Sequence, residues 1–157
     1  MTEVHMSDVL VPKAFCQLEP DMDKESIIAS LAKALASDRR IKTADLDTIV
    51  AGAMAREAVG STGIGHGIAI PHCRSDLVKK IYGAYGFCSA GVGFDSLDGE
   101  PVHSVFFLIT PLDHKEQHIQ LMKNFASQIR KEHFCEFLRQ CADAKALIDL
   151  LTEFENK

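Results

Sequence analysis

The residues best suited to chemistry lie in one glycine-rich segment that ends in a histidine. It reads GSTGIGHGIAIPH over residues 60–72, begins four residues after Arg56, and ends at His72. Glycines let backbone N–H groups approach a phosphoryl group, Ser61 and Thr62 offer hydroxyl donors, and the arginine can offset negative charge. A neutral imidazole is a nucleophile near physiological pH. The segment therefore predicts an anion site where His72 carries a phosphoryl group without a cofactor.

The glycine run itself is predicted to be a loop that leads into a strand. Four glycines within residues 60–67 are too many for a helix interior. His66, inside this run, either hydrogen-bonds the bound group or faces solvent, and we prefer the solvent-facing interpretation. The predicted phosphoryl-binding loop comprises Ser61, Thr62, Gly63, Gly65 and His66.

A second histidine is predicted to face the protein interior. His118 shares the i, i+3, i+4, i+7 spacing of one helix face with Leu121, Met122 and Phe125. It could therefore meet His72 at an edge of the sheet. An inward imidazole that only packs in the core is the alternative interpretation.

Hydrophobic periodicity places strands in the middle of the chain and helices on either side of them. Helices are predicted over residues 23–36, 45–57, 114–131, 134–141 and 143–154, and strands over 68–70, 80–89 and 102–110. Asp23 is the predicted N-cap of the first helix. The residues before it, which contain Pro12 and Pro20, are interpreted as a polar lead. This order predicts a sheet covered on its faces by helices.

Composition favours one soluble domain over residues 1–157, with its core at about 8–154. The chain is 46% hydrophobic and 25% charged and carries a net charge of -5. Its few adjacent basic pairs form no long patch, which disfavours nucleic-acid binding. It has neither a stretch of about 20 apolar residues nor a signal-peptide pattern. We therefore expect a cytoplasmic protein that does not insert into the membrane.

The cysteines are predicted to be reduced thiols. There are five of them, an odd number, and no two form a C-x-x-C pair, so neither a disulfide framework nor a thiol-rich zinc site is expected. Cys73, directly after His72, is interpreted as a packing residue. His114 and His118 lie one helical turn apart, but Glu116 is not where an H-E-x-x-H metallohydrolase places its glutamate. No metal is therefore expected.

Residues 60–72, together with Arg56-Glu57 before them, closely resemble the active-site signature of one phosphotransferase-system family. This family is the fructose/mannitol-type IIA components, which include the nitrogen-regulatory IIA proteins. Residues 94–111 (FDSLDGEPVHSVFFLITP) and 118–121 (HIQL) are similar to two further landmarks of the family. The resemblance implies an α/β single domain, with a mixed central β-sheet flanked by α-helices on both faces.

The same resemblance implies roles for three residues. His72 corresponds to the phosphorylated histidine, His118 to the second active-site histidine, and Arg56 to the arginine beside the phosphoryl group. Two positions depart from the family pattern, since His66 stands where asparagine is frequent and Cys73 where a small residue usually follows the active histidine.

The resemblance leaves two functions open. In one, the protein accepts phosphate from a phosphorylated HPr-type carrier and passes it to a IIB component for sugar transport. In the other, it is a nitrogen-regulatory protein that binds partners according to its phosphorylation. A chain that ends at residue 157 without a fused IIB or membrane domain leans modestly toward regulation. A nucleotide-binding site is disfavoured because the glycines lack G-x-G-x-x-G spacing and precede a strand.

Overall fold

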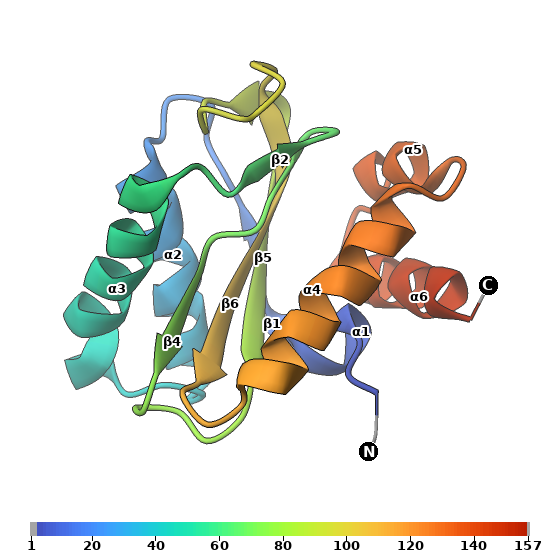
Figure 1. Cartoon of the computed structure of the whole chain (residues 1–157). Helices are drawn as coiled ribbons and strands as arrows, with labels where there is room; N and C mark the ends of the chain where they lie inside the picture. The colour runs from blue at the N-terminus through green and yellow to red at the C-terminus, as the bar shows by residue number, and fades with distance from the viewer. Residues whose placement is uncertain (1–2, 157) are drawn as a thin grey trace.

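The middle layer of the protein is a mixed β-sheet (Figure 1). The computed structural model describes residues 3–156. Within them, six strands form one sheet in the order β1-β5-β6-β3-β2, and β4 pairs with β6 beyond the end of β3. The strands are β1 (Leu10–Gln17), β2 (Gly63–Gly65), β3 (Ile68–Ala69), β4 (His72–Ser75), β5 (Tyr82–Val92) and β6 (Val102–Pro111). β5 and β6 are antiparallel, as are β2 and β3, whereas β1 runs parallel to β5, and β3 and β4 run parallel to β6. The sheet is therefore mixed, as predicted.

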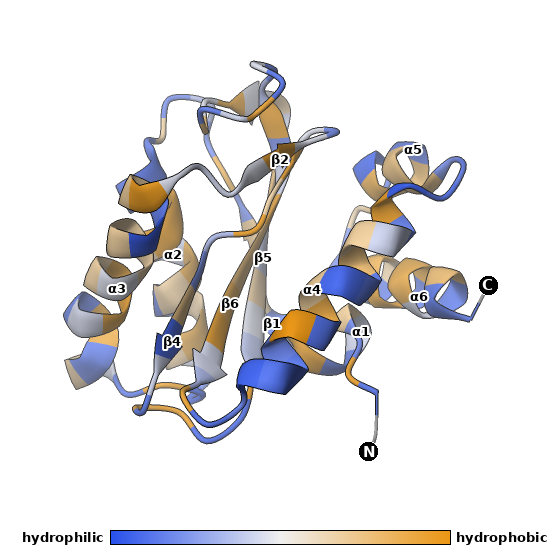
Figure 2. Cartoon of the chain, viewed as in Figure 1, coloured by the Kyte–Doolittle hydropathy of each residue, from blue (hydrophilic) through white to orange (hydrophobic). Residues whose placement is uncertain are grey.

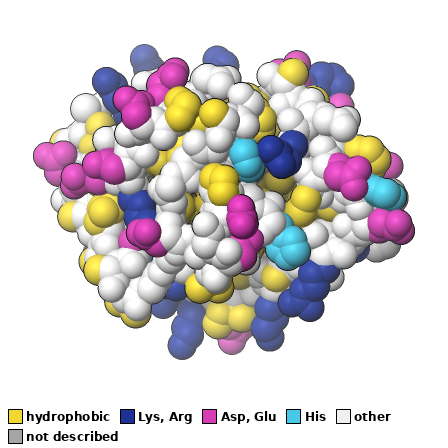
Figure 3. All heavy atoms as spheres, turned by 90° about the horizontal axis from the view of Figure 1, so that it is seen from above, with side chains coloured by type: hydrophobic (Ala, Val, Ile, Leu, Met, Phe, Trp, Pro, Cys, Tyr) yellow, Lys and Arg dark blue, Asp and Glu magenta, His cyan; other side chains and the backbone are white. Residues whose placement is uncertain are grey.

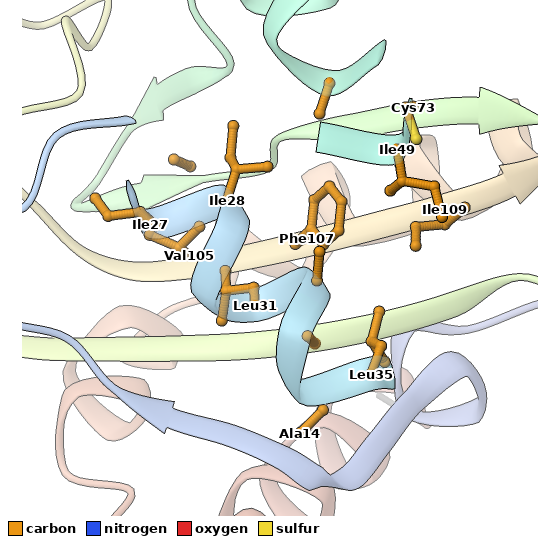
Figure 4. Packing of buried hydrophobic residues seen from close by; sticks show 14 of the residues in the cluster. Ala14, Ile27, Ile28, Leu31, Leu35, Ile49, Cys73, Val105, Phe107 and Ile109 are labelled. Carbon is orange, nitrogen blue, oxygen red and sulfur yellow. The ribbon is translucent and has the colours of Figure 1, made fainter. Parts of the chain in front are cut away.

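Two helices cover one face of the sheet. They are α2 (Lys24–Ser37) and α3 (Leu46–Val59), the latter preceded by the short 3-10 helix η1 (Thr43–Asp45). Asp23 caps α2 as predicted, because its carboxylate accepts a hydrogen bond of 2.8 Å from the Ser26 N–H. The buried hydrophobic residues between these helices and the sheet form the first core. In Figure 4, Ile28 and Leu31 of α2 lie close to Phe107 of β6 within this core.

The opposite face carries the N-terminal helix and the three C-terminal helices. They are α1 (Met6–Val9), α4 (Lys115–Ile129), α5 (Phe134–Arg139) and α6 (Ala144–Glu155). A chain of aromatic contacts links Phe106 of β6 to Phe125 and onward to Phe134, with ring centroids 4.7 and 6.3 Å apart. Figure 2 shows hydrophobic and hydrophilic residues interspersed along the covering helices, as amphipathic helices require. The predicted helix-covered sheet is confirmed.

The interpretation of the first residues as a polar lead was wrong. Within this segment, residues 6–17 form α1 and β1, and β1 pairs with β5 alone. Pro12, which lacks a backbone N–H, is tolerated because β1 is an edge strand. Pro12 and Lys13 are exposed, whereas Val11 and Ala14 are buried in the first core. This half-exposed edge position gives a weak apolar pattern, which explains why the strand was missed.

The predicted glycine loop is partly a β-hairpin. Gly63–Gly65 pairs antiparallel with Ile68–Ala69, and the turn between them has positive φ at Gly65, His66 and Gly67. His72 lies outside this hairpin. It begins the separate strand β4, which pairs with β6 from His72 to Ser75. Between Ala69 and His72, the chain therefore passes from pairing with residues 104–105 of β6 to pairing with residues 108–111.

Charged side chains of both signs lie on the surface of the protein. Figure 3 shows acidic and basic side chains interspersed over the face seen from above. Among the described residues, no helix combines the length and the apolar character needed to cross a membrane. All five cysteines are free, and three of them are buried.

Candidate functional site

The imidazole of His72, the first residue of β4, forms a hydrogen bond with the backbone two residues earlier in the chain. Its Nδ1 lies 2.9 Å from the carbonyl oxygen of Ile70. A carbonyl can only accept, so Nδ1 carries the proton and Nε2 has a free lone pair. Burial lowers the pKa of His72, as does the charge of Arg56, while the Ile70 bond and Glu57 act in the opposite direction. The imidazole is therefore neutral near pH 7, as a nucleophile must be.

His118 lies beside His72, as the helical spacing predicted. It stands in the first turn of α4, and the centroids of the two imidazole rings are 5.0 Å apart with their planes at 50°. Its Nδ1 is 2.9 Å from the hydroxyl of Thr110 at the end of β6. Burial, together with the nearby His72 and Arg74, lowers the pKa of His118 to about 4. The site thus holds two neighbouring imidazoles that are both neutral at pH 7.

Two arginines act on this histidine pair from different elements. Arg56, near the end of α3, donates from Nη1 to the carbonyl of Gly60 at 2.8 Å, and its charge reaches His72. Arg74, on β4, donates from Nη2 to the carbonyl of Leu112 and its charge reaches His118. Arg74 was missed by sequence reasoning. The signal was available, because residues i and i+2 of a strand face the same side, so Arg74 follows His72.

The two hydroxyl residues of the predicted loop are engaged within the loop. Ser61 donates to the carbonyl of Phe94 at 2.7 Å and accepts from the Gly63 N–H. The Thr62 hydroxyl donates to the carboxylate of Glu57, which also accepts from the Thr62 N–H. These contacts anchor the loop in this structure. Direct contact between either hydroxyl and a phosphoryl group stays a prediction.

A buried carboxylate ties the loop to two helices. Glu57 at the end of α3 is 6% exposed, and its Oε1 lies 3.0 Å from Nζ of Lys24, at the start of α2. Lys24 also lies 3.4 Å from the exposed Asp95 and over the ring of Phe94. Sequence reasoning did not find this pair, because Lys24 and Glu57 are far apart along the chain.

The remaining loop residues differ in their surroundings. Gly63 is packed so closely that an added Cβ would lie 2.9 Å from Cα of Ser96. Gly65 has φ +93°, which favours glycine. His66 is exposed at the tip of the β2–β3 turn, with φ +58°. The solvent-facing position agrees with the preferred interpretation of His66, while its role in phosphoryl binding stays a prediction.

Cys73 points away from the histidine pair. It belongs to the core under α2 and α3, where burial raises the pKa of its thiol to about 11. An added Cβ on Gly52 of α3 would lie 3.5 Å from Cβ of Cys73. The packing interpretation of this residue agrees with its position. Among residues 3–156, no three histidine, cysteine, aspartate or glutamate side chains gather as a metal site would require.

Comparison with known proteins identifies the class of protein that has this fold and this pair of histidines. Residues 10–154 match the family model for the EIIA 2 component of the phosphoenolpyruvate-dependent sugar phosphotransferase system. The chain therefore belongs to this IIA family. The family resemblance read from the sequence is confirmed.

Individual relatives come from both branches of the family. The chain is 32% identical over 153 residues to the nitrogen regulatory protein of Pseudomonas aeruginosa, covering 98% of each chain. It is 29% identical over 135 residues to the fructose-specific EIIA component of Haloferax volcanii, covering 86% of each. Among solved structures, nitrogen regulatory protein IIA-Ntr from Neisseria meningitidis matches with a TM-score of 0.81 and 28% identity, covering 93% of this chain and 98% of that one.

A more distant structure matches in fold alone. It is the mannitol IIA of Escherichia coli in a complex with phosphorylated mannitol IIB, with a TM-score of 0.74 and 18% identity, covering 92% of this chain and 99% of that one. These matches support a phosphoryl carrier or regulator within the phosphotransferase system.

Proposed function

We propose that this protein accepts a phosphoryl group on Nε2 of His72 from a phosphorylated HPr-type carrier and passes it to a IIB component. The observation that carries this proposal is the bond between His72 Nδ1 and the Ile70 carbonyl. It keeps the proton on Nδ1 and leaves the Nε2 lone pair available. Burial and Arg56 keep the ring neutral near pH 7. The cytoplasmic location predicted from the sequence fits these partners and stays a prediction.

The phosphoryl transfer requires no cofactor. The Nε2 lone pair forms a new N–P bond while the N–P bond to the donor imidazole breaks, and the electron pair of the broken bond stays with that imidazole. Nδ1 of His72 keeps its proton and donates a hydrogen bond to the Ile70 carbonyl throughout. Transfer to an acceptor on IIB breaks the His72 N–P bond in the same way. The phosphoryl group passes on and His72 returns to its neutral form.

The neighbouring side chains supply charge stabilisation. Positioning and electrostatics dominate phosphoryl transfer, because the phosphoryl oxygens carry most of the charge. Arg56 offsets that charge from the α3 side, and His118 donates a hydrogen bond from the α4 side. Nη1 of Arg56 bonds the Gly60 carbonyl in this structure, and the remaining N–H groups of the guanidinium can donate to the phosphoryl oxygens.

The test is incubation with the phosphorylated carrier followed by intact-mass measurement. Wild type should gain one acid-labile, base-stable phosphoryl group, and His72→Ala should gain none. His133→Asn is the matched control, because this exposed histidine precedes α5, outside the predicted site, and asparagine also tolerates its positive φ. It should be labelled like wild type. Labelling of His72→Ala to the wild-type level would show that the phosphorylated residue lies elsewhere.

A regulatory function is the second candidate, and the nitrogen regulatory relative favours it because the match covers 98% of both chains. Phosphorylation adds about -1.5 to -2 charges beside His118 and Arg56. A partner docking there must desolvate this charge, so the two forms of the protein should bind different partners. Pull-downs with wild type, His72→Ala and His72→Glu test this. Identical partner sets, together with rapid transfer to a sugar-specific IIB cysteine, would leave transport as the function.

A further inference from the structure

Thr110 makes a direct hydrogen bond to the second histidine from a fully buried position. It is 0% exposed near the end of β6, and its hydroxyl lies 2.9 Å from Nδ1 of His118. Thr110 lies opposite Arg74 in the pairing of β6 with β4, and β4 is the strand that begins with His72. It therefore connects the sheet to the helix that brings His118 to the site. Neither sequence analysis nor the family match assigns it a role.

The direction of this bond follows from the surroundings of the hydroxyl. A buried O–H is costly to leave without an acceptor. Within residues 3–156, His118 Nδ1 is the hydrogen-bond partner found for the Thr110 hydroxyl. The hydroxyl must therefore donate, and Nδ1 must accept. Since the pKa of His118 is about 4, its ring is neutral at pH 7 and carries its proton on Nε2.

The segment between the two residues holds this geometry in place. Leu112 follows the last residue of β6, and its carbonyl accepts from Arg74. The next turn closes with hydrogen bonds from the His114 N–H to Pro111 at 3.1 Å and from the His118 N–H to His114 at 3.0 Å. The backbone between Thr110 and His118 is thus fixed at each end and in the middle. These hydrogen bonds join the end of β6 to the first turn of α4, which carries His118.

We propose that Thr110 is a positioning residue, which holds His118 as the Nε2–H tautomer and so aims a hydrogen-bond donor at the phosphoryl group on His72. This inference rests on the proposed function. The two histidines are then held in opposite tautomers by different partners. The Ile70 carbonyl leaves a lone pair on Nε2 of His72, and the Thr110 hydroxyl leaves a proton on Nε2 of His118. One ring receives the phosphoryl group and the other donates to its oxygens.

The experiment combines nitrogen-15 NMR of the imidazoles with transfer rates. In wild type at pH 7, His118 should show the Nε2–H tautomer, a result that needs no variant and no phosphorylation. Thr110→Val, which removes only the donor, should give a mixture of tautomers and slow onward transfer by about tenfold, as the loss of one hydrogen bond implies. Thr110→Ser, which restores the hydroxyl, should recover both the tautomer and the rate.

Ser104→Ala is the matched control on the same strand. It removes a buried hydroxyl that lies 2.8 Å from the Tyr85 hydroxyl, on the part of β6 that pairs with β3 and not with β4. It should leave both the His118 tautomer and the transfer rate unchanged. If Ser104→Ala slows transfer as much as Thr110→Val, the effect is a general loosening of β6 and the proposal is overturned.

Other outcomes separate this inference from the proposed function. An Nδ1–H tautomer of His118 in wild type would overturn the role of Thr110 even if His72 is phosphorylated normally. Unchanged tautomer and rate in Thr110→Val, or failure of Thr110→Ser to recover them, would do the same. A wild-type protein with the expected tautomer that accepts no phosphoryl group would instead overturn the proposed function, and with it the purpose assigned to Thr110.

Discussion

The carboxylate of Glu57 and the ammonium of Lys24 form an ion pair of 3.0 Å although the carboxylate side chain is only 3% exposed. The pair joins the end of α3 to the start of α2. Because the same carboxylate accepts from both the N–H and the hydroxyl of Thr62, it also anchors the loop before β2. Loss of the Glu57 carboxylate should therefore lower the stability of the protein and also disturb the phosphoryl site.

Glu57→Gln should lower the free energy of unfolding by about 2–3 kcal/mol, because it leaves the Lys24 charge without its buried partner. It should also slow phosphoryl acceptance. Urea denaturation and the mass assay measure the two effects. Asp95→Asn is the control, since Asp95 is the exposed partner of the same lysine. Should both variants behave alike, the burial of Glu57 has no special importance.

Gly63→Ala should destabilise the protein by about 1–3 kcal/mol, because the new methyl group would lie 2.9 Å from the Ser96 backbone. Gly60→Ala, three residues earlier, meets no atom within 4 Å and has an extended φ of 172°. It should change the thermal midpoint little. Thermal unfolding followed by circular dichroism makes the comparison. Equal midpoints for the two variants would contradict the packing of Gly63 against residue 96.

The depressed pKa of His118 predicts a loss of stability in mild acid. An unfolded histidine protonates near pH 6.5, but His118 in the folded protein does so at about 4. Between these values the unfolded state binds more protons, so stability falls as pH drops from 6.5 toward 4. His72 contributes in the same direction. In His118→Gln the fall should be smaller, which denaturation at a series of pH values would reveal. An equal fall in both proteins would contradict the pKa assigned to His118.

Cys73 should be inert to alkylation in the folded protein. Its thiol is buried and has a pKa of about 11, so little thiolate exists at pH 8. Iodoacetamide followed by peptide mass mapping should label Cys73 in urea but not under native conditions. The partly buried Cys16 and Cys135 should react sooner. Rapid native labelling of Cys73 would mean that the strand after His72 opens readily.

Much of this architecture was predictable because it rests on local patterns. The apolar stripes of α2, α3 and α4 recur at helical spacing, and His118 continues the stripe of α4, so its inward position could be foreseen. The strand β1 could not be foreseen, because it lies at the edge of the sheet, is partly exposed, and therefore shows a weaker apolar pattern. The positive-φ turn at His66 was likewise hidden, since the glycines around it fit a loop as well as a hairpin.

The parts of the site that could not be predicted depend on register and on distant contacts. Arg74 and Thr110 face each other only because β4 pairs with β6 in one register. Nothing in a single sequence specifies that register. Likewise, the Glu57–Lys24 pair requires the packing of α2 on α3. The residues that could undergo chemistry were recognisable, whereas those that orient them emerge from the tertiary structure.

Strand β6 contributes to both cores, and both histidines are joined to it, His72 through strand pairing and His118 through the Thr110 hydroxyl. Cys73, next to His72, packs under α2 and α3, while Leu121, one turn after His118, packs with Phe106 in the opposite core. A chimera that takes α4–α6 from a relative would therefore set foreign helices against this side of β6, including the hydroxyl that binds His118. To preserve phosphoryl transfer, such a graft has to bring β6 with its helices.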